Sequence, residues 1–244
     1  MIIYGRNATK EAILSEKTFN KLYVDKNCRD KTSEEIISLA KENNIKINFV
    51  ERKILDQKFN SKEKVSHQGF VAEIVDFAYA ELEDIFYVAK QKNEPPFIII
   101  LDGVEDPHNL GAIIRTAECA GVCGVIIPEH RACAVNDTVL KTSAGAANLV
   151  KIVRVTNINQ CIEKLKEKGV WIYAMEADGE NLWAANLTGP IAIVMGSEGT
   201  GVSRLTKQKC DGIISIPMFG KINSLNVSVA TAISTYEILK QRNK

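Results

Sequence analysis

The second half of the chain contains six short, largely apolar runs separated by segments of helical character. Strands that are covered on both faces need runs of this kind, because neither face of their sheet meets water. Strands that alternate with helices form a parallel sheet with right-handed crossovers. The pattern therefore predicts a doubly wound α/β domain, closed by a helix over about Leu225–Arg242. The six runs are Phe97–Leu101, Val125–Ile127, Leu149–Val153, Trp171–Met175, Ile191–Met195 and Ile213–Ile216.

The first 75 residues predict a small α/β module of their own. A helix is expected over Ser33–Asn43, because Thr32 or Ser33 can cap its free N–H groups and its apolar residues share one face. Residues 76–95 are acidic and run into Pro95-Pro96, which removes two backbone donors. We therefore expect an N-terminal domain over 1–75, a linker over 76–95 and a main domain over 96–244. The strands expected in the N-terminal domain are Lys21–Asp25, Ile45–Val50 and Gly69–Val75.

Composition excludes several classes of protein. With 45% hydrophobic and 25% charged residues, the chain has ordinary globular usage. Its longest uninterrupted apolar run is Phe97–Leu101, whereas a membrane-spanning helix needs about 18 apolar residues. The first residues carry neither the apolar core nor the cleavage site of a signal peptide, so a cytoplasmic protein is expected. The formal net charge of +1 limits any polyanion partner to a local basic patch.

The cysteines and histidines give no metal-binding pattern. The six cysteines contain no C-x-x-C pair, and the three histidines lie far apart in the sequence. We expect free thiols in a reducing compartment and no metal site.

Three loops with unusual residues follow three of the predicted strands. In a sheet of this kind, ligands bind outside the carboxyl ends of the strands. The first loop, 102–111, contains Asp106 and Asn109 and leads into a helix with Arg115 among small and apolar residues. A turn with a helix cap explains Asp106 and Asn109 by itself. A guanidinium on an apolar helix needs a partner, and we expect Glu198 of the second loop to supply it.

The second and third loops combine permissive backbone with polar side chains. Gly196–Gly201 holds three glycines, so its backbone can approach a ligand closely, although an ordinary glycine-rich turn is the simpler alternative. The spacing matches neither a dinucleotide fingerprint nor a Walker loop. In the third loop Ser224, Asn226 and Ser228 alternate with apolar residues just before a helix. A single helix cap needs only one such residue, which favours contact with a polar substrate.

Together, the three loops resemble the three signature motifs of the SpoU-type RNA 2′-O-ribose methyltransferases in the SPOUT superfamily. Motif 1 corresponds to DPHNLGAIIRTA at 106–117, motif 2 to MGSEGTG at 195–201 and motif 3 to IPMFGKINSLNVSVA at 216–230. Tyr4–Ala12 and His67–Ala72 resemble the two ends of the substrate-binding domain of bacterial ribosomal RNA members, a domain similar to a small ribosomal-protein RNA-binding fold. The likeness covers essentially the whole chain. It is closest to the enzymes that methylate a guanosine ribose in 23S rRNA.

This resemblance implies a fold, a cofactor and a set of site residues. Members thread the C-terminal segment through a loop to form a deep trefoil knot, and they form homodimers through the knotted region. Their cofactor is S-adenosylmethionine, and their substrate is RNA. The implied cofactor-binding residues are Met195, Gly196, Gly201, Ile216, Met218 and Leu225. The implied catalytic residues are Arg115, Asn109, Glu198, Ser224 and Asn226.

Two roles are open for Arg115. It occupies the position of the arginine proposed in the family to take the proton of the ribose 2′-hydroxyl, with the other four residues orienting it or the RNA. An arginine holds its proton with a pKa above about 12, so a free guanidine base is unfavourable at neutral pH. Arg115 is therefore also a candidate to bind the target phosphate or to stabilise developing alkoxide charge.

Three other functions are compatible with parts of the sequence. A non-catalytic RNA-binding protein of the same fold would have lost the polar site residues, which are all present. A ribose methyltransferase that acts on tRNA usually lacks the N-terminal module. A nucleotide-dependent oxidoreductase on such a sheet needs the motif G-x-G-x-x-G after the first long strand. Residues 102–111, which follow that strand, contain only Gly103 and Gly111.

The basic residues of the N-terminal module are candidates to hold RNA phosphates. Bases and acids are almost balanced there, so solvated surface is the simpler explanation for any one of them. The candidates include Arg6, Lys10, Lys21, Lys26 and Arg29.

Overall fold

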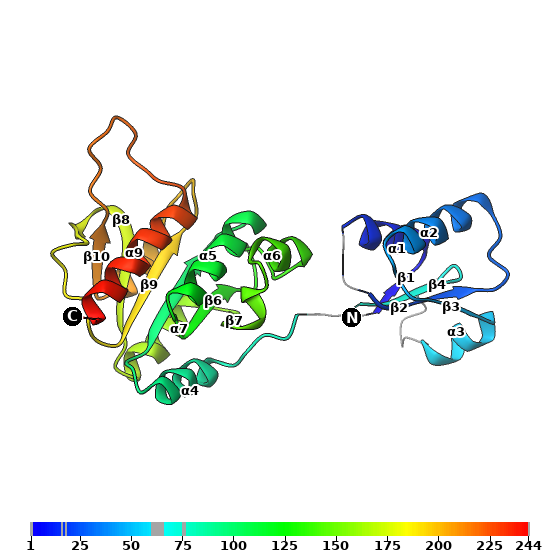
Figure 1. Cartoon of the computed structure of the whole chain (residues 1–244), viewed down its shortest axis with the longest axis horizontal. Helices are drawn as coiled ribbons and strands as arrows, with labels where there is room; N and C mark the ends of the chain where they lie inside the picture. The colour runs from blue at the N-terminus through cyan, green and yellow to red at the C-terminus, as the bar shows by residue number, and fades with distance from the viewer. Residues whose placement is uncertain (1, 16, 18, 60–65, 75–76, 244) are drawn as a thin grey trace. The chain divides into compact units, whose positions relative to one another are not determined.

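The structure is a computed structural model that describes residues 2–15, 17, 19–59, 66–74 and 77–243. It divides into two compact units, Met1–Ala78 and Tyr79–Lys244. Each unit has its own sheet (Figure 1). Each also has its own hydrophobic core. Over the described ranges, no helix has both the length and the apolar character needed to cross a membrane.

The N-terminal unit is a mixed α/β structure. Its strands are β1 Ile2–Tyr4, β2 Phe19–Asp25, β3 Ile47–Val50 and β4 Phe70–Ile74, and its helices are α1 Arg6–Leu14, α2 Lys31–Glu42 and α3 Arg52–Lys58. The sheet order is β1-β4-β2-β3, in which only β2 and β3 are parallel. Ile13 of α1 and Ile36 of α2 pack on one face of the sheet, and Leu55 of α3 packs on the other.

The elements predicted for this unit are present, with one change at the helix start. The side chain of Asp30, not that of Thr32 or Ser33, caps α2 and accepts a hydrogen bond from Ser33 N–H at 3.2 Å. The apolar residues of the helix begin at Ile36, after its first turn, so their pattern does not show where the helix starts. The sequence therefore does not distinguish Asp30 from Thr32 or Ser33 as the cap. Val75, the expected end of the last strand, lies outside the described residues.

Two of the basic candidates for RNA contact are engaged in ion pairs within the unit. Arg6 pairs with Asp30 at 2.9 Å, and Lys10 pairs with Glu35 at 2.6 Å. No side-chain hydrogen bond or ion pair joins Lys21, Lys26 or Arg29 to the part of the chain that the structure describes.

The six predicted apolar runs of the second unit are all strands. Their bounds are β5 Phe97–Asp102, β6 Gly124–Pro128, β7 Lys151–Val155, β8 Trp171–Asn181, β9 Ile191–Gly196 and β10 Gly212–Ser215. They form one sheet in the order β10-β8-β9-β5-β6-β7, and every pairing is parallel. The predicted parallel sheet is therefore confirmed. Its carboxyl ends, including those of the neighbours β5, β9 and β8, lie along one edge.

Helices cover both faces of this sheet. They are α4 Leu82–Lys92, α5 Pro107–Cys119, α6 Asp137–Thr142, α7 Ile158–Glu167, α8 Arg204–Lys209 and α9 Val227–Arg242, with a short 3₁₀ turn at Ala146–Asn148. Helices α5 and α9 lie side by side on one face (Figure 1). Helices α4 and α7 pack against the other face, where they share a core with Ile98, Ile100 and Ile172.

The segment 76–95, predicted as a linker, mostly belongs to the second unit. Helix α4 occupies much of it, and Ile85 and Ala89 of α4 are buried in the core. Three of the acidic residues of this segment, Glu81, Glu83 and Asp84, lie at the helix start, where Glu81 and Asp84 form a capping box. The double proline follows the helix end at Asn93, which has the left-handed conformation typical of a helix terminus.

The final helix begins at Val227, two residues after its expected start, because Asn226 is its N-cap. A long loop, 216–226, leads to it from β10 (Figure 1). The helix then packs against α5 and β9. The trefoil knot implied by the resemblance stays a prediction.

Candidate active site

Three polar side chains from the three predicted loops meet at the carboxyl edge of the sheet. Glu198 follows β9, Asn109 lies in the first turn of α5, and Asn226 caps α9. Glu198 Oε1 accepts hydrogen bonds from Asn109 Nδ2 at 2.9 Å and from Asn226 Nδ2 at 2.7 Å. Asn226 Nδ2 also donates to Asn109 Oδ1 at 2.9 Å. These contacts join residues that are up to 117 positions apart in the chain.

The cap of α9 fixes the orientation of Asn226. Its Oδ1 accepts from Ser228 N–H at 2.9 Å and from Ser228 Oγ at 2.6 Å. Because the oxygen is used by the helix, the amide nitrogen is turned toward Glu198. Asn109 is buried, so its side chain has little freedom to leave the cluster. The Glu198 carboxylate is thus held by two oriented donors.

A first cavity of about 360 Å³ lies beside this cluster. Its walls combine apolar side chains with a few polar ones, which is typical of a small-molecule site. Glu198 and Ser224 of the predicted catalytic set line it. So do all six residues predicted to bind the cofactor, namely Met195, Gly196, Gly201, Ile216, Met218 and Leu225.

Two glycines at the turn after β9, Gly196 and Gly201, are required for different reasons. A side chain on Gly196 would overlap the backbone of Gly201, because the turn closes on itself there. Ser197 and Gly201 exchange backbone hydrogen bonds at 3.2 and 3.0 Å across this turn. Gly201 has a φ of +65°, a conformation that glycine adopts without strain.

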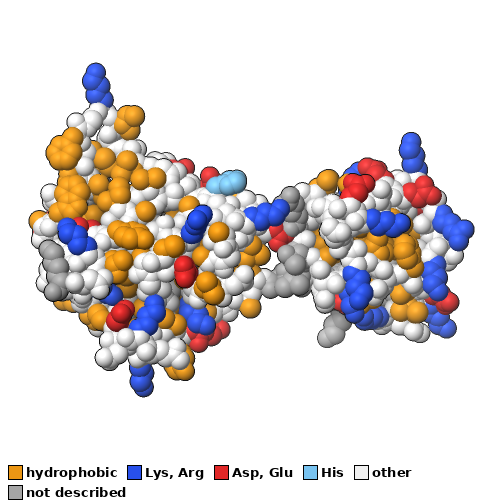
Figure 2. Space-filling model, in the orientation of Figure 1, with side chains coloured by type: hydrophobic (Ala, Val, Ile, Leu, Met, Phe, Trp, Pro, Cys, Tyr) orange, Lys and Arg blue, Asp and Glu red, His pale blue; other side chains and the backbone are white. Residues whose placement is uncertain are grey.

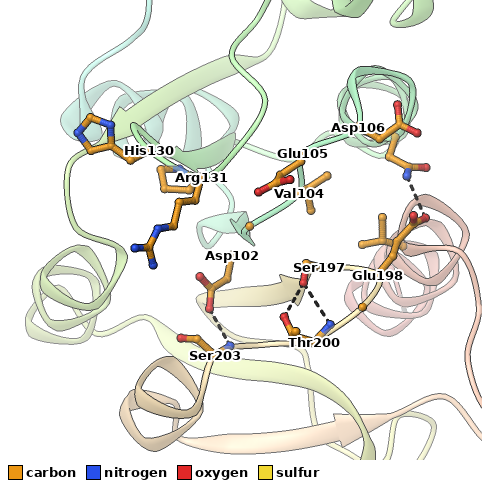
Figure 3. Close-up of a pocket in the computed structure, with 16 residues that line it drawn as sticks. Asp102, Val104, Glu105, Asp106, His130, Arg131, Ser197, Glu198, Thr200 and Ser203 are labelled. Carbon is orange, nitrogen blue, oxygen red and sulfur yellow. Dashed lines mark hydrogen bonds between the residues drawn. The ribbon is translucent and has the colours of Figure 1, made fainter.

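A second cavity, of about 690 Å³, lies on the other side of the same turn. Asp102, Glu105 and Asp106 line it, with Arg131 on the side away from Glu198 (Figure 3). Residues of the turn, including Glu198, line both cavities. The turn is therefore a wall between two compartments, and the Glu198 carboxylate stands at that wall.

Arg115 is the predicted site residue that the structure brings neither to the cluster nor to a cavity. It is exposed and lines neither cavity. The expected pair between Arg115 and Glu198 is wrong, because Glu198 is held by two amides instead. Arg115 lies six residues after Asn109, which at about 100° per residue places it roughly 240° around the helix and on a different face.

Two further carboxylates at this site were not predicted from the sequence. Asp102 Oδ2 accepts from Ser203 N–H at 2.9 Å (Figure 3), and Glu176 Oε1 accepts from Val202 N–H at 2.6 Å. Asp102 is the last residue of β5, and Glu176 directly follows the predicted apolar run Trp171–Met175, at the edge where ligands bind in parallel sheets. That position is the signal that could have found them.

Free thiols supply no nucleophile to either compartment. All six cysteines are free, and none of them lines the two cavities. Burial raises the pKa of Cys161 to about 11 and that of Cys210 to about 12, so both are protonated at neutral pH. Within the described ranges, no three His, Cys, Asp or Glu side chains are grouped so as to hold a metal ion.

The fold and these cavities define a class, namely an α/β protein with two neighbouring cavities at the carboxyl ends of a parallel sheet. Comparison with known proteins identifies the family. Residues 96–236 match the model of the SpoU rRNA Methylase family, and residues 2–80 match a model described as RNA 2′-O ribose methyltransferase substrate binding. The chain belongs to the SpoU rRNA methylase family, as its three motifs predicted.

Two relatives support this family assignment. YacO of Bacillus subtilis (strain 168), named for the TrmH family of tRNA/rRNA methyltransferases, is 42% identical over 99% of this chain and 96% of its own. A Staphylococcus haemolyticus (strain JCSC1435) protein named for the same family is 43% identical over 100% of this chain and 97% of its own.

Two solved structures share the fold. AviRb from Streptomyces viridochromogenes, solved in complex with AdoMet (S-adenosylmethionine), matches with a TM-score of 0.64 at 21% identity over 100% of this chain and 90% of its own. The TrmH/SpoU tRNA modifying enzyme of A. aeolicus matches with a TM-score of 0.57 at 31% identity over 66% of this chain and 83% of its own.

Proposed function

We propose that this chain transfers the methyl group of S-adenosylmethionine to the 2′-hydroxyl of a ribose in RNA. The observation that carries the proposal is the pair of cavities separated by one turn, with Glu198 at the boundary. A methyl transfer needs two reactants that meet at a single point. The arrangement offers one compartment for each, and family membership supports the assignment.

The first cavity suits the cofactor. Its volume of about 360 Å³ lies within the range of sites that hold small ligands. Apolar side chains such as Met195, Ile216 and Leu225 match the faces of an adenine ring and the carbon chain beside the sulfur. The Glu198 carboxylate suits a ligand that carries positive charge. When bound there, S-adenosylmethionine supplies a methyl group that is already activated by the sulfonium.

The second cavity is the entry for the target nucleotide. Glu198 faces it with a carboxylate that Asn109 and Asn226 hold in place. In this position the carboxylate accepts a hydrogen bond from the ribose hydroxyl and aims the oxygen at the neighbouring compartment. The hydroxyl proton passes to the Glu198 carboxylate as the O–C bond forms and the methyl–sulfur bond breaks, which leaves S-adenosylhomocysteine as the second product. Alignment of two reactants in this way contributes about 7–11 kcal/mol to the lowering of a barrier.

Arg115 binds an RNA phosphate in this scheme. Of the roles open to it, phosphate binding fits its exposed place on α5, since it has no contact with the Glu198 cluster. A guanidinium also matches phosphate with two parallel hydrogen bonds. The proton-acceptor role implied by the family would require Arg115 to reach the cavity from another face of its helix.

The presence of the N-terminal unit favours ribosomal RNA as the substrate class. The specific target we propose is a guanosine of 23S rRNA. The N-terminal unit matches the substrate-binding model over residues 2–80. The rRNA methyltransferase from Sinorhizobium meliloti covers 98% of this chain, whereas the tRNA modifying enzyme of A. aeolicus covers 66%. A substrate in tRNA is the alternative outcome.

We also propose that the catalytic unit forms the family's knot and a homodimer. Hydrophobic side chains gather on the loop between β10 and α9 (Figure 2), where Phe219 is 93% and Ile222 77% exposed. An exposed apolar patch of this kind is typical of a protein interface.

The test is to incubate the protein with total RNA and methyl-labelled S-adenosylmethionine and to map the labelled nucleotide. We expect label on one ribose of 23S rRNA, and none when the acceptor is a 2′-deoxynucleotide. Label on tRNA would favour the alternative substrate. Label that survives the 2′-deoxy substitution would place the methyl group on a base and contradict the proposal.

A further inference from the structure

Strand β8 carries a large bulge next to the proposed cofactor cavity. Ile213 of β10 is in register with Ala174, but the next residue, Ile214, is in register with Glu180. The five residues 175–179 are therefore looped out between two paired positions. Gly179 closes the bulge, since any side chain there would lie 2.6 Å from the backbone of Ile213. The bulge forms one wall of the first cavity through Met175, Glu176 and Ala177.

Glu176 reaches from this bulge to the end of the turn that separates the two cavities. Its Oε1 accepts from Val202 N–H at 2.6 Å and lies 3.7 Å from Lys207 Nζ of α8. The Glu176 side chain is only 17% exposed. A Cβ added at Gly201 would lie 2.5 Å from the same oxygen, so carboxylate and turn are in close contact.

The hydrogen bond to Val202 is difficult to replace. Val202 is 1% exposed, and a buried N–H that loses its acceptor is destabilising. The next N–H along the chain, that of Ser203, is held by Asp102 from the opposite cavity. Carboxylates from two different strands, β8 and β5, thus accept hydrogen bonds from the two successive N–H groups that directly follow the turn.

We propose that Glu176 is a positioning residue for cofactor binding. It holds the turn 196–201 against the β8 bulge through Val202 N–H, and it thereby sets the width of the first cavity. This role rests on the proposed function of that cavity. It acts through the backbone of the turn, so the acceptor oxygen of residue 176 matters more than its negative charge.

The test measures the dissociation constants of S-adenosylmethionine and of its demethylated product, S-adenosylhomocysteine, by isothermal titration calorimetry. Glu176→Ala removes the acceptor, and we expect both constants to rise about tenfold or more, the factor that corresponds to losing a hydrogen bond to a charged group. Glu176→Gln keeps a side-chain oxygen for Val202 N–H, so both constants should stay within about threefold of the wild type.

Lys207→Met is the matched control, because it removes only the ion pair. We expect it to change either constant less than about twofold, as is usual for a single partly exposed pair. Thermal unfolding of each variant checks that the fold is retained. Should Glu176→Ala fail to fold, Glu176→Met fills a similar volume without an acceptor and takes its place.

The outcomes separate this role from the proposed function. Wild-type protein that binds neither ligand contradicts the cofactor assignment and this role with it. Wild-type binding that Glu176→Ala and Glu176→Met leave unchanged overturns the role of Glu176 alone. A loss confined to S-adenosylmethionine, with no rescue by Glu176→Gln, overturns it in favour of direct contact between the carboxylate and the sulfonium charge.

Discussion

Glu198 shows how much of the site could be predicted at the scale of single residues. A carboxylate in a glycine-rich turn after a buried strand marks the carboxyl edge of the sheet, and Glu198 lies there. Its partners were not predictable from that pattern. Asn109 and Asn226 reach it because one is buried in the first turn of α5 and the other caps α9. The place of Arg115 could have been predicted, because six residues at about 100° each put it on a different face of α5 from Asn109.

Asn226→Asp separates the two contacts of this side chain. The aspartate keeps an oxygen for Ser228 N–H, so the cap of α9, worth about 1 kcal/mol, is retained. It donates no hydrogen bond to Glu198 and places a second negative charge beside it. We expect turnover in the RNA methylation assay to fall about 100-fold, the size of effect seen when one oriented polar group is removed from an active site.

Asn226→Ala is the control for stability. It removes the cap as well, so urea denaturation should show a free energy of unfolding about 1 kcal/mol lower than that of the wild type. Turnover of Asn226→Asp within about threefold of the wild type would contradict the role of the Glu198 cluster.

Arg115→Lys tests the phosphate contact. The lysine keeps the positive charge but lacks the planar guanidinium that can form two parallel hydrogen bonds with a phosphate. We therefore expect kcat/KM for RNA to fall about tenfold or more. Because Arg115 lies outside both cavities, the dissociation constant of S-adenosylmethionine should not change. Near-normal turnover, or weaker cofactor binding, would show that the assignment is wrong.

At the scale of elements, the apolar runs predicted the strands well and the segments between them poorly. Each of the six runs is a strand, because a sheet buried on both faces leaves a continuous apolar signature. Helix α4 was missed because its acidic first turn gave the segment the composition of a linker. The bulge in β8 was missed because the predicted apolar run ends at Met175 and the register beyond it depends on the partner strand. Gly179, which closes the bulge, is the local sequence signal for it.

The C-terminal end of α9 is anchored far from the site, and this anchor gives a stability prediction. The Arg242 guanidinium donates to the carbonyls of Pro95 and Pro96, both at 2.9 Å, and to that of Gly189 at 2.6 Å. It also lies 4.9 Å from the ring of Phe97, and burial lowers the pKa of this arginine. Arg242→Lys leaves a single nitrogen in place of the two that reach these carbonyls and removes the planar group beside Phe97, so we expect the free energy of unfolding to fall by about 1–3 kcal/mol.

Urea denaturation measures this change, with Lys240→Ala as the control. Lys240 is exposed, and its partner Glu237, at 2.9 Å, also accepts a hydrogen bond from Gln241 Nε2 at 3.0 Å. Loss of the lysine should therefore lower the free energy of unfolding by less than about 1 kcal/mol. Equal stabilities of the two variants would show that Arg242 does not anchor α9.

At the scale of the whole molecule, the sequence predicted two units and the structure moves the boundary between them. The division falls after Ala78, and the residues beyond it complete the catalytic unit through α4. A doubly wound sheet could be derived from periodicity alone, whereas a knot could not, since general rules of chain connection argue against one. The function required the three motifs together, because each loop alone has an ordinary structural explanation.

The most direct test of the central claim is a crystal structure with S-adenosylmethionine bound. The account predicts the cofactor in the cavity lined by Met195, Ile216 and Leu225, with its methyl group facing the second cavity beside Glu198. A cofactor bound anywhere else, or one whose methyl group faces away from Glu198, would contradict it.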